Sequence, residues 1–300
     1  MFEFNKEFRR RLKKIDSSKE FFDYLKKPLK KSIRINTLKA DATEVLRKLE
    51  KLYELEKIPW CEHGFYINTE NAGNTLEHKL GLIFSQEASS MIPATVMELK
   101  PGMLVLDMAA SPGAKTTQIA QYMENEGCIV ANDVKKSRIN ILISNLQRCG
   151  VLIAKVTLRD GRSFSKFEST FDAVLLDAPC SNTGMIRKNF KYAAIWRKRE
   201  VETLSRLQKD LISSAYRSLK LGGVMVYSTC SLDPEENEGV VDYLLSNTEA
   251  EIEKIELPVR KHTPFLKFDG KKFDRQVKNC LRIHPQDNDT GGFFVAKVIK

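Results

Sequence analysis

Residues 103–116 read MLVLDMAASPGAKT, and this stretch decides the fold. An apolar run ends at Asp107, a turn of small residues follows, and helical spacing resumes from about Ala114 to Glu124. The same order of apolar strand, turn and helix recurs downstream, where further strands are expected to end at Asp133, Asp160, Asp177 and near Thr229. Near-continuous apolar strands that alternate with helices indicate a parallel sheet covered on both faces. We therefore predict an α/β fold with a doubly wound sheet.

The chain before this region has a different pattern. Apolar residues at helical spacing predict a helix within the first thirty residues, and a strand, a helix and a second strand are expected within residues 32–67. We predict two domains. A small basic α+β unit with its N-terminal helix covers residues 1–84, and the larger α/β domain covers residues 85–300.

Positive charge is concentrated in two segments. The 300 residues include 49 Lys and Arg against 39 Asp and Glu, a formal net charge of +10. Residues 1–51 hold sixteen Lys and Arg against eight Asp and Glu, and a second basic cluster lies between Arg187 and Arg199. A localised basic surface attracts phosphate backbones without sequence preference. The charge pattern therefore favours a nucleic-acid partner over a merely solvated surface.

Other classes of protein are disfavoured by what the sequence lacks. No apolar run approaches the ~18 residues of a membrane span, and the N-terminus has no apolar core of a secretory signal. We expect a cytoplasmic protein without membrane contact, whose six cysteines are free thiols. The cysteines form no C-x-x-C pair, so no metal is expected. The histidines are interpreted as surface or structural residues: His63, His78, His262 and His284.

The first turn indicates the class of cofactor. In doubly wound sheets ligands bind beyond the carboxyl ends of the strands. The turn lacks G-x-G-x-x-G, and it lacks the glycine before Lys115 that a P-loop requires. It therefore offers no cradle for a pyrophosphate, which favours an adenosine ligand without phosphates, such as S-adenosylmethionine. Asp133, at the end of the second strand, is placed to accept hydrogen bonds from a ribose diol. Any single strand-end aspartate has a plainer explanation as a turn former.

Two cysteines follow predicted strands at the same end of the sheet, Cys180 in DAPCS and Cys230 in STCS. An isolated cysteine is usually a small buried hydrophobe, but these two directly follow polar or turn-forming residues. A thiolate that adds to carbon 6 of cytosine makes carbon 5 nucleophilic enough to accept a methyl group. A second acid or base group assists breakdown of the adduct. Asp177 is placed to stabilise the ring, and Lys115 to favour the thiolate. The residues alone leave open which thiol attacks.

Together these motifs resemble the RNA cytosine-5 methyltransferases of the NOL1/NOP2/Sun family, and the compact chain is similar to archaeal tRNA members. The segments that carry the resemblance are SIRINTLK, FSQEASSMIPA, LDMAASPGAKTTQIA, FDAVLLDAPCS, GMIRKN, YSTCSLDPEENE and GGFFVAKV. The resemblance implies a Rossmann-like class I methyltransferase domain after a domain like an RNA-recognition motif. It implies that Cys230 forms the adduct and that Cys180 assists product release. It also implies cofactor contacts from Ala109, Ala110, Ser111, Pro112, Gly113, Ala114, Lys115, Asp133 at the ribose, Arg138, Asp160 at the adenine edge, and Asp177.

Three alternatives remain at this point. A DNA cytosine-5 methyltransferase would use Cys180, the P-C cysteine, as its nucleophile. A member that methylates rRNA, rather than the favoured tRNA, would keep every residue above. A non-catalytic RNA-binding assembly factor would keep the fold but gain little from the cysteine pair. We expect a monomer that binds RNA by its basic N-terminal face, which lacks an aromatic signature for base stacking.

Overall fold

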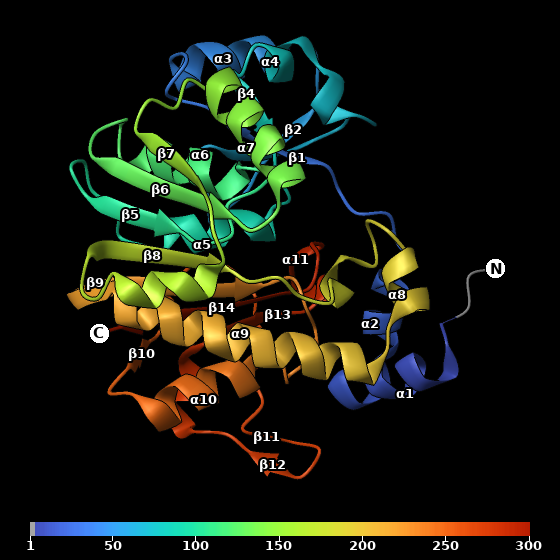
Figure 1. Cartoon of the computed structure of the whole chain (residues 1–300). Coiled ribbons are helices and arrows are strands. Elements are labelled where there is room, and N and C mark those ends of the chain that lie inside the picture. The colour runs from blue at the N-terminus through green and yellow to red at the C-terminus, as the bar shows by residue number, and fades with distance from the viewer. Residues whose placement is uncertain (1–3) are drawn as a thin grey trace. The chain divides into compact units, whose positions relative to one another are not determined.

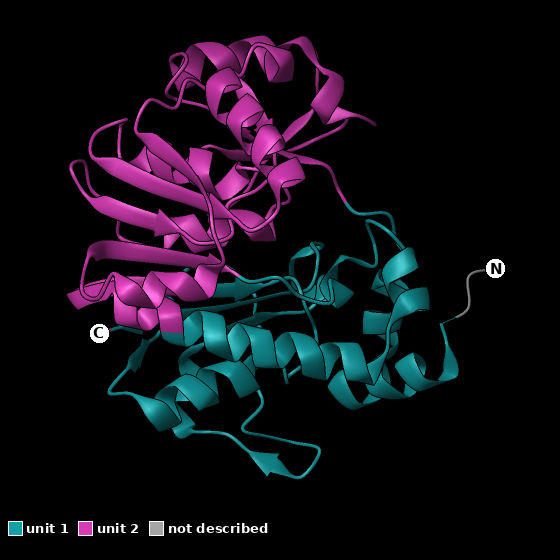
Figure 2. Ribbon diagram, in the orientation of Figure 1, with its two compact units in different colours: residues 1–29, 178–213, 227–299 teal, residues 30–177, 214–226, 300 magenta. Residues whose placement is uncertain are grey.

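The structure is a computed structural model that describes residues 4–300 (Figure 1). Met1, Phe2 and Glu3, the first residues of the expected N-terminal helix, lie outside the described residues. Packing divides the chain into two compact units (Figure 2). Unit 1 comprises residues 1–29, 178–213 and 227–299, and unit 2 comprises residues 30–177, 214–226 and 300.

Unit 2 contains the predicted parallel sheet. Its strands are β5 (Leu104–Asp107), β6 (Cys128–Asp133), β7 (Ala154–Leu158), β8 (Phe171–Asp177) and the first part of β9 (Leu219–Thr229), in the order β9-β8-β5-β6-β7. The pairs β5–β6, β5–β8 and β6–β7 are parallel. The apolar strands are largely buried, as parallel strands between helical layers should be. This arrangement confirms the predicted α/β fold.

Helices connect the strands of this sheet. They are α5 (Ile92–Thr95), α6 (Ala114–Tyr122), α7 (Lys136–Arg148) and the end of α9 (Lys198–Ser218), with short 3-10 turns η2 (Ser89–Met91) and η3 (Gly161–Lys166). Helix α7 packs on β6 and β7, while α5 packs on β8. Gly113, at the start of α6, has φ of +103°, a conformation that side-chain-bearing residues rarely adopt. This glycine therefore allows the strand–turn–helix connection that the sequence predicted.

A second, antiparallel sheet in unit 2 forms the small α+β unit. Its elements are β1 (Ser32–Ile35), α3 (Ala42–Glu50), β2 (Leu55–Lys57), β3 (Gly64–Ile67), η1 (Ala72–Asn74), α4 (Leu76–Lys79) and β4 (Ile83–Ser85). The strand order is β2-β3-β1-β4. Apolar residues of β1, β3 and β4 pack on α3 around Val45 and Leu49. The order β-α-β-β-α-β and this pairing are those of ferredoxin-like folds, to which RNA-recognition motifs belong. The strand β4, which the sequence did not predict, ends at Ser85, one residue beyond the small unit predicted over residues 1–84.

Unit 1 contains the N-terminal helices and most of the C-terminal part of the chain. Its helices are α1 (Lys6–Ile15), α2 (Lys19–Tyr24), α8 (Lys191–Ile195), most of α9, α10 (Glu238–Asn247) and α11 (Pro285–Asn288), with 3-10 turns η4 (Thr183–Met185) and η5 (Arg275–Asn279). Its strands are β10 (Glu251–Glu253), β11 (Lys267–Phe268), β12 (Lys271–Lys272), β13 (Leu281–Ile283), β14 (Phe293–Ile299) and the end of β9. Phe8 and Leu12 of α1 are buried in one apolar cluster with Trp196 and Leu232.

The two compact units of the structure differ from the two domains predicted from the sequence. Residues 84 and 85, where a domain boundary was expected, both lie inside unit 2. The N-terminal helices belong to unit 1 because their apolar faces pack on α8 and on residues near Leu232. Strand β9 starts in unit 2 and ends in unit 1, directly before Cys230. Among residues 4–300, none of the helices combines the length and apolar character needed to cross a membrane.

Candidate active site

The turn after β5 is held against the ends of neighbouring strands. The amide of Ala110 donates to the carbonyl of Asn132 at 2.7 Å, and the buried Asn132 side chain donates to the carbonyls of Met108 and Arg159. The side chain of Asn132 in β6 thus fixes the segments that follow the two neighbouring strands, β5 and β7. The small residues at 109 and 110 leave the backbone of the turn open to close approach by a ligand.

Asp133, Arg138 and Ser111 form one network beside this turn. Asp133 is buried, and its Oδ1 accepts from the amide of Lys135 at 3.0 Å. Its Oδ2 has no hydrogen-bond partner among residues 4–300, although the Nε of Arg138 lies 3.4 Å away. The Ser111 hydroxyl donates to the carbonyl of Arg138, whose guanidinium donates to the carbonyl of Ser111. The structure therefore places Asp133 and Arg138 beside the turn and leaves one buried acceptor available.

Asp160 lies apart from this network. It precedes η3, and its carboxylate accepts from the backbone and guanidinium of Arg162, which lowers its pKa. Strand β7 ends at Leu158, two residues before the expected position. The carboxylate acts here as a helix cap, the plainer explanation for a strand-end aspartate.

Asp107, which also ends a strand, is buried beneath the turn. Its Oδ2 accepts from the hydroxyl of Thr116 at 2.6 Å, and its Oδ1 has no partner among the described residues. Burial raises the pKa of Asp107 to about 7, because a charge in this environment lacks solvation. The nearby Asp177 raises it further, whereas Thr116 and Lys115 lower it.

Lys115 and Asp177 form an ion pair within unit 2. The Nζ of Lys115 donates to the Oδ2 of Asp177 at 2.7 Å and to the hydroxyl of Ser90 at 2.9 Å. The lysine side chain is 10% exposed and the aspartate side chain 33% exposed. A carboxylate paired in this way is held in a fixed orientation. The sequence did not identify Ser90, because a single serine in a short 3-10 turn carries no signal of its own.

The two cysteines lie together in unit 1. Their sulfur atoms are 3.4 Å apart, and the Sγ of Cys230 donates to the Oδ1 of Asn182 at 3.1 Å. The pKa of the Cys180 thiol is well above its usual value. The causes are its hydrogen bond to Cys230, burial, and the charges of Cys230 and Glu236. Cys180 therefore keeps its proton at neutral pH and can donate to the sulfur of Cys230.

The loops that carry the cysteines touch through their backbones. The amide of Gly184 donates to the carbonyl of Cys230 at 2.8 Å, and the amide of Gly292 donates to the carbonyl of Gly184 at 2.8 Å. A Cβ atom at position 184 would lie 2.0 Å from the carbonyl oxygen of Gly292. Only glycine fits this position, so the glycine of the GMIRKN motif has a steric explanation.

Three histidine and aspartate side chains meet elsewhere in unit 1. Ligand-type atoms of Asp16, His262 and His284 lie within 4.8 Å of one another. The rings of His262 and His284 stack at 3.9 Å, and the Nδ1 of His284 is 3.0 Å from Asp16. Asp16 and His284 are 268 positions apart in the sequence, so the spacing of residues could not reveal the cluster.

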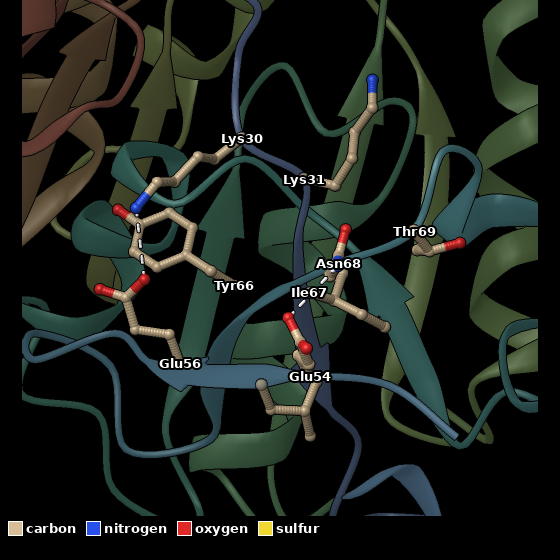
Figure 3. Close-up of a pocket in the computed structure, with 9 residues that line it drawn as sticks. Lys30, Lys31, Glu54, Glu56, Tyr66, Ile67, Asn68 and Thr69 are labelled. Carbon is tan, nitrogen blue, oxygen red and sulfur yellow. Dashed lines mark hydrogen bonds and ion pairs between the residues drawn. The ribbon is translucent and has the colours of Figure 1, made fainter.

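A cavity of about 540 Å³ lies at the edge of the small sheet (Figure 3). Lys30 reaches over the ring of Tyr66, with its Nζ 5.1 Å from the ring centre, and also pairs with Glu56. Tyr66 is 8% exposed. The face of this ring is thus already in contact with a lysine, whereas the Lys31 side chain extends from the backbone at the cavity edge (Figure 3).

Comparison with known proteins gives two family matches. Residues 94–299 match the family described as 16S rRNA methyltransferase RsmB/F, and residues 2–88 match the N-terminal domain of 16S rRNA methyltransferase RsmF. A protein of Pyrococcus abyssi named tRNA (cytosine(49)-C(5))-methyltransferase is 58% identical over 99% of this chain and 96% of its own length. The ribosomal RNA small subunit methyltransferase F of Aliivibrio fischeri is 43% identical, and the chain spans 60% of that protein.

Solved structures with the same fold include two proteins of Pyrococcus horikoshii. One, described as a methyltransferase homolog, has a TM-score of 0.87 at 35% identity and covers 99% of this chain and 95% of its own. The other, described as NSun6 with SFG, has a TM-score of 0.85 at 25% identity and covers 99% of this chain and 98% of its own.

Proposed function

Because the chain belongs to the RsmB/F family of methyltransferases, we propose that it methylates carbon 5 of cytosine in tRNA with S-adenosylmethionine. One observation carries the proposal: a protein named for this reaction on tRNA is 58% identical and is matched over 96% of its length. The bacterial rRNA enzymes are less similar and are matched over only 60% of theirs. Methylation of rRNA is the second candidate, favoured by the description of the family.

The residues of unit 2 fit the cofactor. The unpartnered Oδ2 of Asp133 is a buried acceptor suited to a ribose hydroxyl, and Arg138 fixes the neighbouring turn. The small residues from Ala109 to Ala114 would lie against the ligand, with Asp160 and Asp177 as further contacts. When bound, S-adenosylmethionine supplies an electrophilic methyl group. The SFG of the NSun6 structure is an analogue of this cofactor, which supports the assignment.

The cysteine pair supplies the covalent chemistry in this proposal. The thiol proton of Cys230 leaves to solvent, and the sulfur then bonds to carbon 6 of cytosine while the electron pair of the C5–C6 double bond moves to carbon 5. After methylation the carbon 5 proton leaves to a base, the double bond re-forms and the bond from sulfur to carbon 6 breaks. Cys180 keeps its proton at neutral pH, so it donates a hydrogen bond to the Cys230 sulfur when that sulfur is charged. This division favours Cys230 as the nucleophile.

Asp177 and Lys115 serve the substrate ring in this proposal. Asp177 lies three residues before Cys180 in the chain, and its ion pair with Lys115 fixes the orientation of its carboxylate. An oriented carboxylate accepts a hydrogen bond from the 4-amino group of cytosine or from protonated nitrogen 3. Lys115, whose Nζ is bound to Asp177 and Ser90, thus acts through Asp177, and its favouring of the Cys230 thiolate stays a prediction.

The N-terminal residues 1–84 are proposed to bind RNA, and residues 85–300 to catalyse. The separate family matches at residues 2–88 and 94–299 support this division. The ring of Tyr66 already contacts Lys30, which supports contacts to the RNA backbone rather than base stacking. The proposal includes action in the cytoplasm as a monomer.

The test is transfer of labelled methyl groups from S-adenosylmethionine to RNA by the purified chain. Separate reactions contain tRNA, rRNA and a DNA duplex, and bisulfite sequencing locates the modified cytosine. We expect incorporation at cytosine in tRNA alone. Incorporation only into rRNA would support the second candidate. Incorporation only into DNA would identify a DNA cytosine-5 methyltransferase that uses Cys180. No incorporation into any substrate would favour a non-catalytic assembly factor.

A further inference from the structure

One carboxylate, that of Glu236, contacts the residue that follows each cysteine of the pair. Its Oε2 accepts from the amide of Ser181 at 3.0 Å, and its Oε1 accepts from the hydroxyl of Ser231 at 2.7 Å. The hydroxyl of Ser181 also donates to Oε1, and it lies 3.0 Å from the hydroxyl of Ser231. Glu236 is 0% exposed. The two cysteine loops, fifty residues apart in sequence, are thus joined by this buried carboxylate in addition to the backbone hydrogen bond between Gly184 and Cys230.

We call the contacts of Glu236 with Ser181 and Ser231 the Glu236 bridge. From it we infer that Glu236 is a positioning residue for the cysteine pair, which holds the two loops so that the two sulfur atoms stay in contact. The inference rests on the proposed function for its catalytic meaning, but the bridge itself can be tested without methylation. Ser181 and Ser231 each directly follow one of the two cysteines, so a displacement of either serine moves the sulfur beside it. Each loop has a further contact beside the bridge. Gln208 of α9 donates to Oε2 at 2.9 Å and to the carbonyl of Pro179 in the Cys180 loop at 2.8 Å, and the amide of Asp233 donates to Ser231 at 3.0 Å.

The hydrogen bonds at this position require a carboxylate. Burial of a carboxylate is costly, but four hydrogens reach the two oxygens of Glu236, and a neutral amide offers only one acceptor oxygen. Burial and the charge of Asp233 raise the pKa of Glu236 to about 7, while its hydrogen bonds from the two serines and Gln208 lower it. The charge of Glu236 is in turn one cause of the raised pKa of Cys180. The same group therefore positions the pair and favours the protonated form of Cys180.

The charged groups around Glu236 come from several elements. Asp233 lies on the same loop and pairs with Arg11 of α1 at 2.9 Å. Cys180 lies on the loop after β8, and Glu235, the preceding residue, is partly exposed and also pairs with Arg11. Glu235 therefore offers a matched control: an adjacent glutamate on the same loop that contacts neither serine in the bonds described.

The first experiment measures the proximity of the sulfur atoms in the full chain. Diamide accepts two electrons and two protons from the two thiols as the Cys180–Cys230 disulfide forms, and mass spectrometry after alkylation gives the rate. We expect Glu236→Ala to slow this reaction about tenfold, because proximity of reacting atoms sets the rate. Glu236→Gln should lie between it and the native chain, and Glu235→Gln should match the native chain. An unchanged rate in Glu236→Ala would overturn the inference.

Ser231→Ala is the second variant, in case Glu236→Ala does not fold. It removes the hydrogen bond from the Cys230 loop to Glu236 and leaves the contact of Ser181 with Glu236 in place. A slower disulfide rate in a folded Ser231→Ala chain, with the melting temperature as the check on folding, supports the bridge. A native rate contradicts it.

The second experiment asks whether the bridge matters for catalysis. We expect Glu236→Gln to lower kcat for methylation about tenfold with KM for RNA unchanged. The ratio of native to variant kcat should fall as the pH drops through about 7, where Glu236 loses its charge. A ratio constant with pH would exclude a role for the charge. If the native chain methylates no RNA, the proposed function fails, while the disulfide rates still decide the bridge.

Discussion

The sulfur atoms of Cys180 and Cys230 lie 3.4 Å apart, although the residues are separated by fifty positions in the chain. The pKa of Cys180 is raised by its hydrogen bond to Cys230, by burial and by nearby negative charge. The sulfur of Cys230 also donates to the Oδ1 of Asn182, so the two thiols in contact have different surroundings. This asymmetry gives a physical reason for their separate roles in the proposed reaction.

The roles of the two cysteines can be separated by trapping. RNA that contains 5-azacytidine cannot complete the reaction, so a nucleophile that adds to it stays covalently attached. We expect Cys230→Ala to abolish the covalent complex, because it removes the attacking sulfur. Cys180→Ala should retain the complex and release product more slowly. Gel mobility under denaturing conditions measures both, and loss of the complex in Cys180→Ala alone would reverse the assignment.

Asp133 is predicted to contribute directly to cofactor affinity. Asp133→Ala removes a buried acceptor, and a hydrogen bond to a charged group contributes about 1.5–3 kcal/mol. We expect the Kd for S-adenosylmethionine to rise by roughly one to two orders of magnitude, measured by calorimetry. Glu126→Gln, an exposed glutamate between β5 and β6, is the matched control and should bind as the native chain does. Equal affinities in all three proteins would remove Asp133 from the site.

Asp107 should make the stability of the chain depend on pH. Its pKa is about 7 when folded, above the ordinary value of 3.8, so the folded state binds the proton more tightly than the unfolded state. The contribution of Asp107 to the free energy of unfolding therefore falls as the pH rises from about 4 to 7, and it stays constant above pH 7. Asp107→Asn should flatten this decrease. Thermal melts at pH 5, 6, 7 and 8 measure it, and parallel curves for both proteins would exclude the effect.

Gly184 is predicted to tolerate no side chain. In Gly184→Ala the added Cβ would lie 2.0 Å from the carbonyl oxygen of Gly292 and 2.8 Å from that of Cys230. Backbone must move to relieve both contacts, and overpacking costs about 1–3 kcal/mol. We expect a lower melting temperature and slower methylation. Gly73→Ala, whose Cβ would meet nothing closer than 3.6 Å, is the control and should leave both unchanged.

Local patterns in the sequence account for most of the fold. Helices α6, α7 and α9 and the strands that end at Asp107, Asp133 and Asp177 follow from apolar spacing and turn residues. Apolar spacing does not specify strand pairing, so the antiparallel order of the small sheet and its fourth strand at residues 83–85 were not predicted. Nor does it specify packing, and the first helices were expected with the small sheet although they belong to unit 1.

The candidate site was predictable only in part. The turn around Gly113 and the positions of the cysteines carry recognisable signals, because their residue types are needed for close approach or for chemistry. Asn132, Asn182 and Glu236 carry none, since a buried amide or carboxylate is identified by its partners and not by its neighbours in sequence. The ion pair between Lys115 and Asp177 was also not predictable from the sequence. Asp177 was expected at the substrate, but only the folded structure shows that it pairs with Lys115.

The strand β9 limits how sequences of this kind can change in length. It runs without interruption from Leu219 to Thr229, and Cys230 follows at once. Side chains alternate between the two faces of a strand, so deletion or insertion of one residue would turn the cysteine to the opposite face. Substitutions within β9 can be accommodated by repacking, whereas changes of length cannot. Insertions among related genes should instead fall in the exposed turn between β11 and β12, where no reacting group depends on the register.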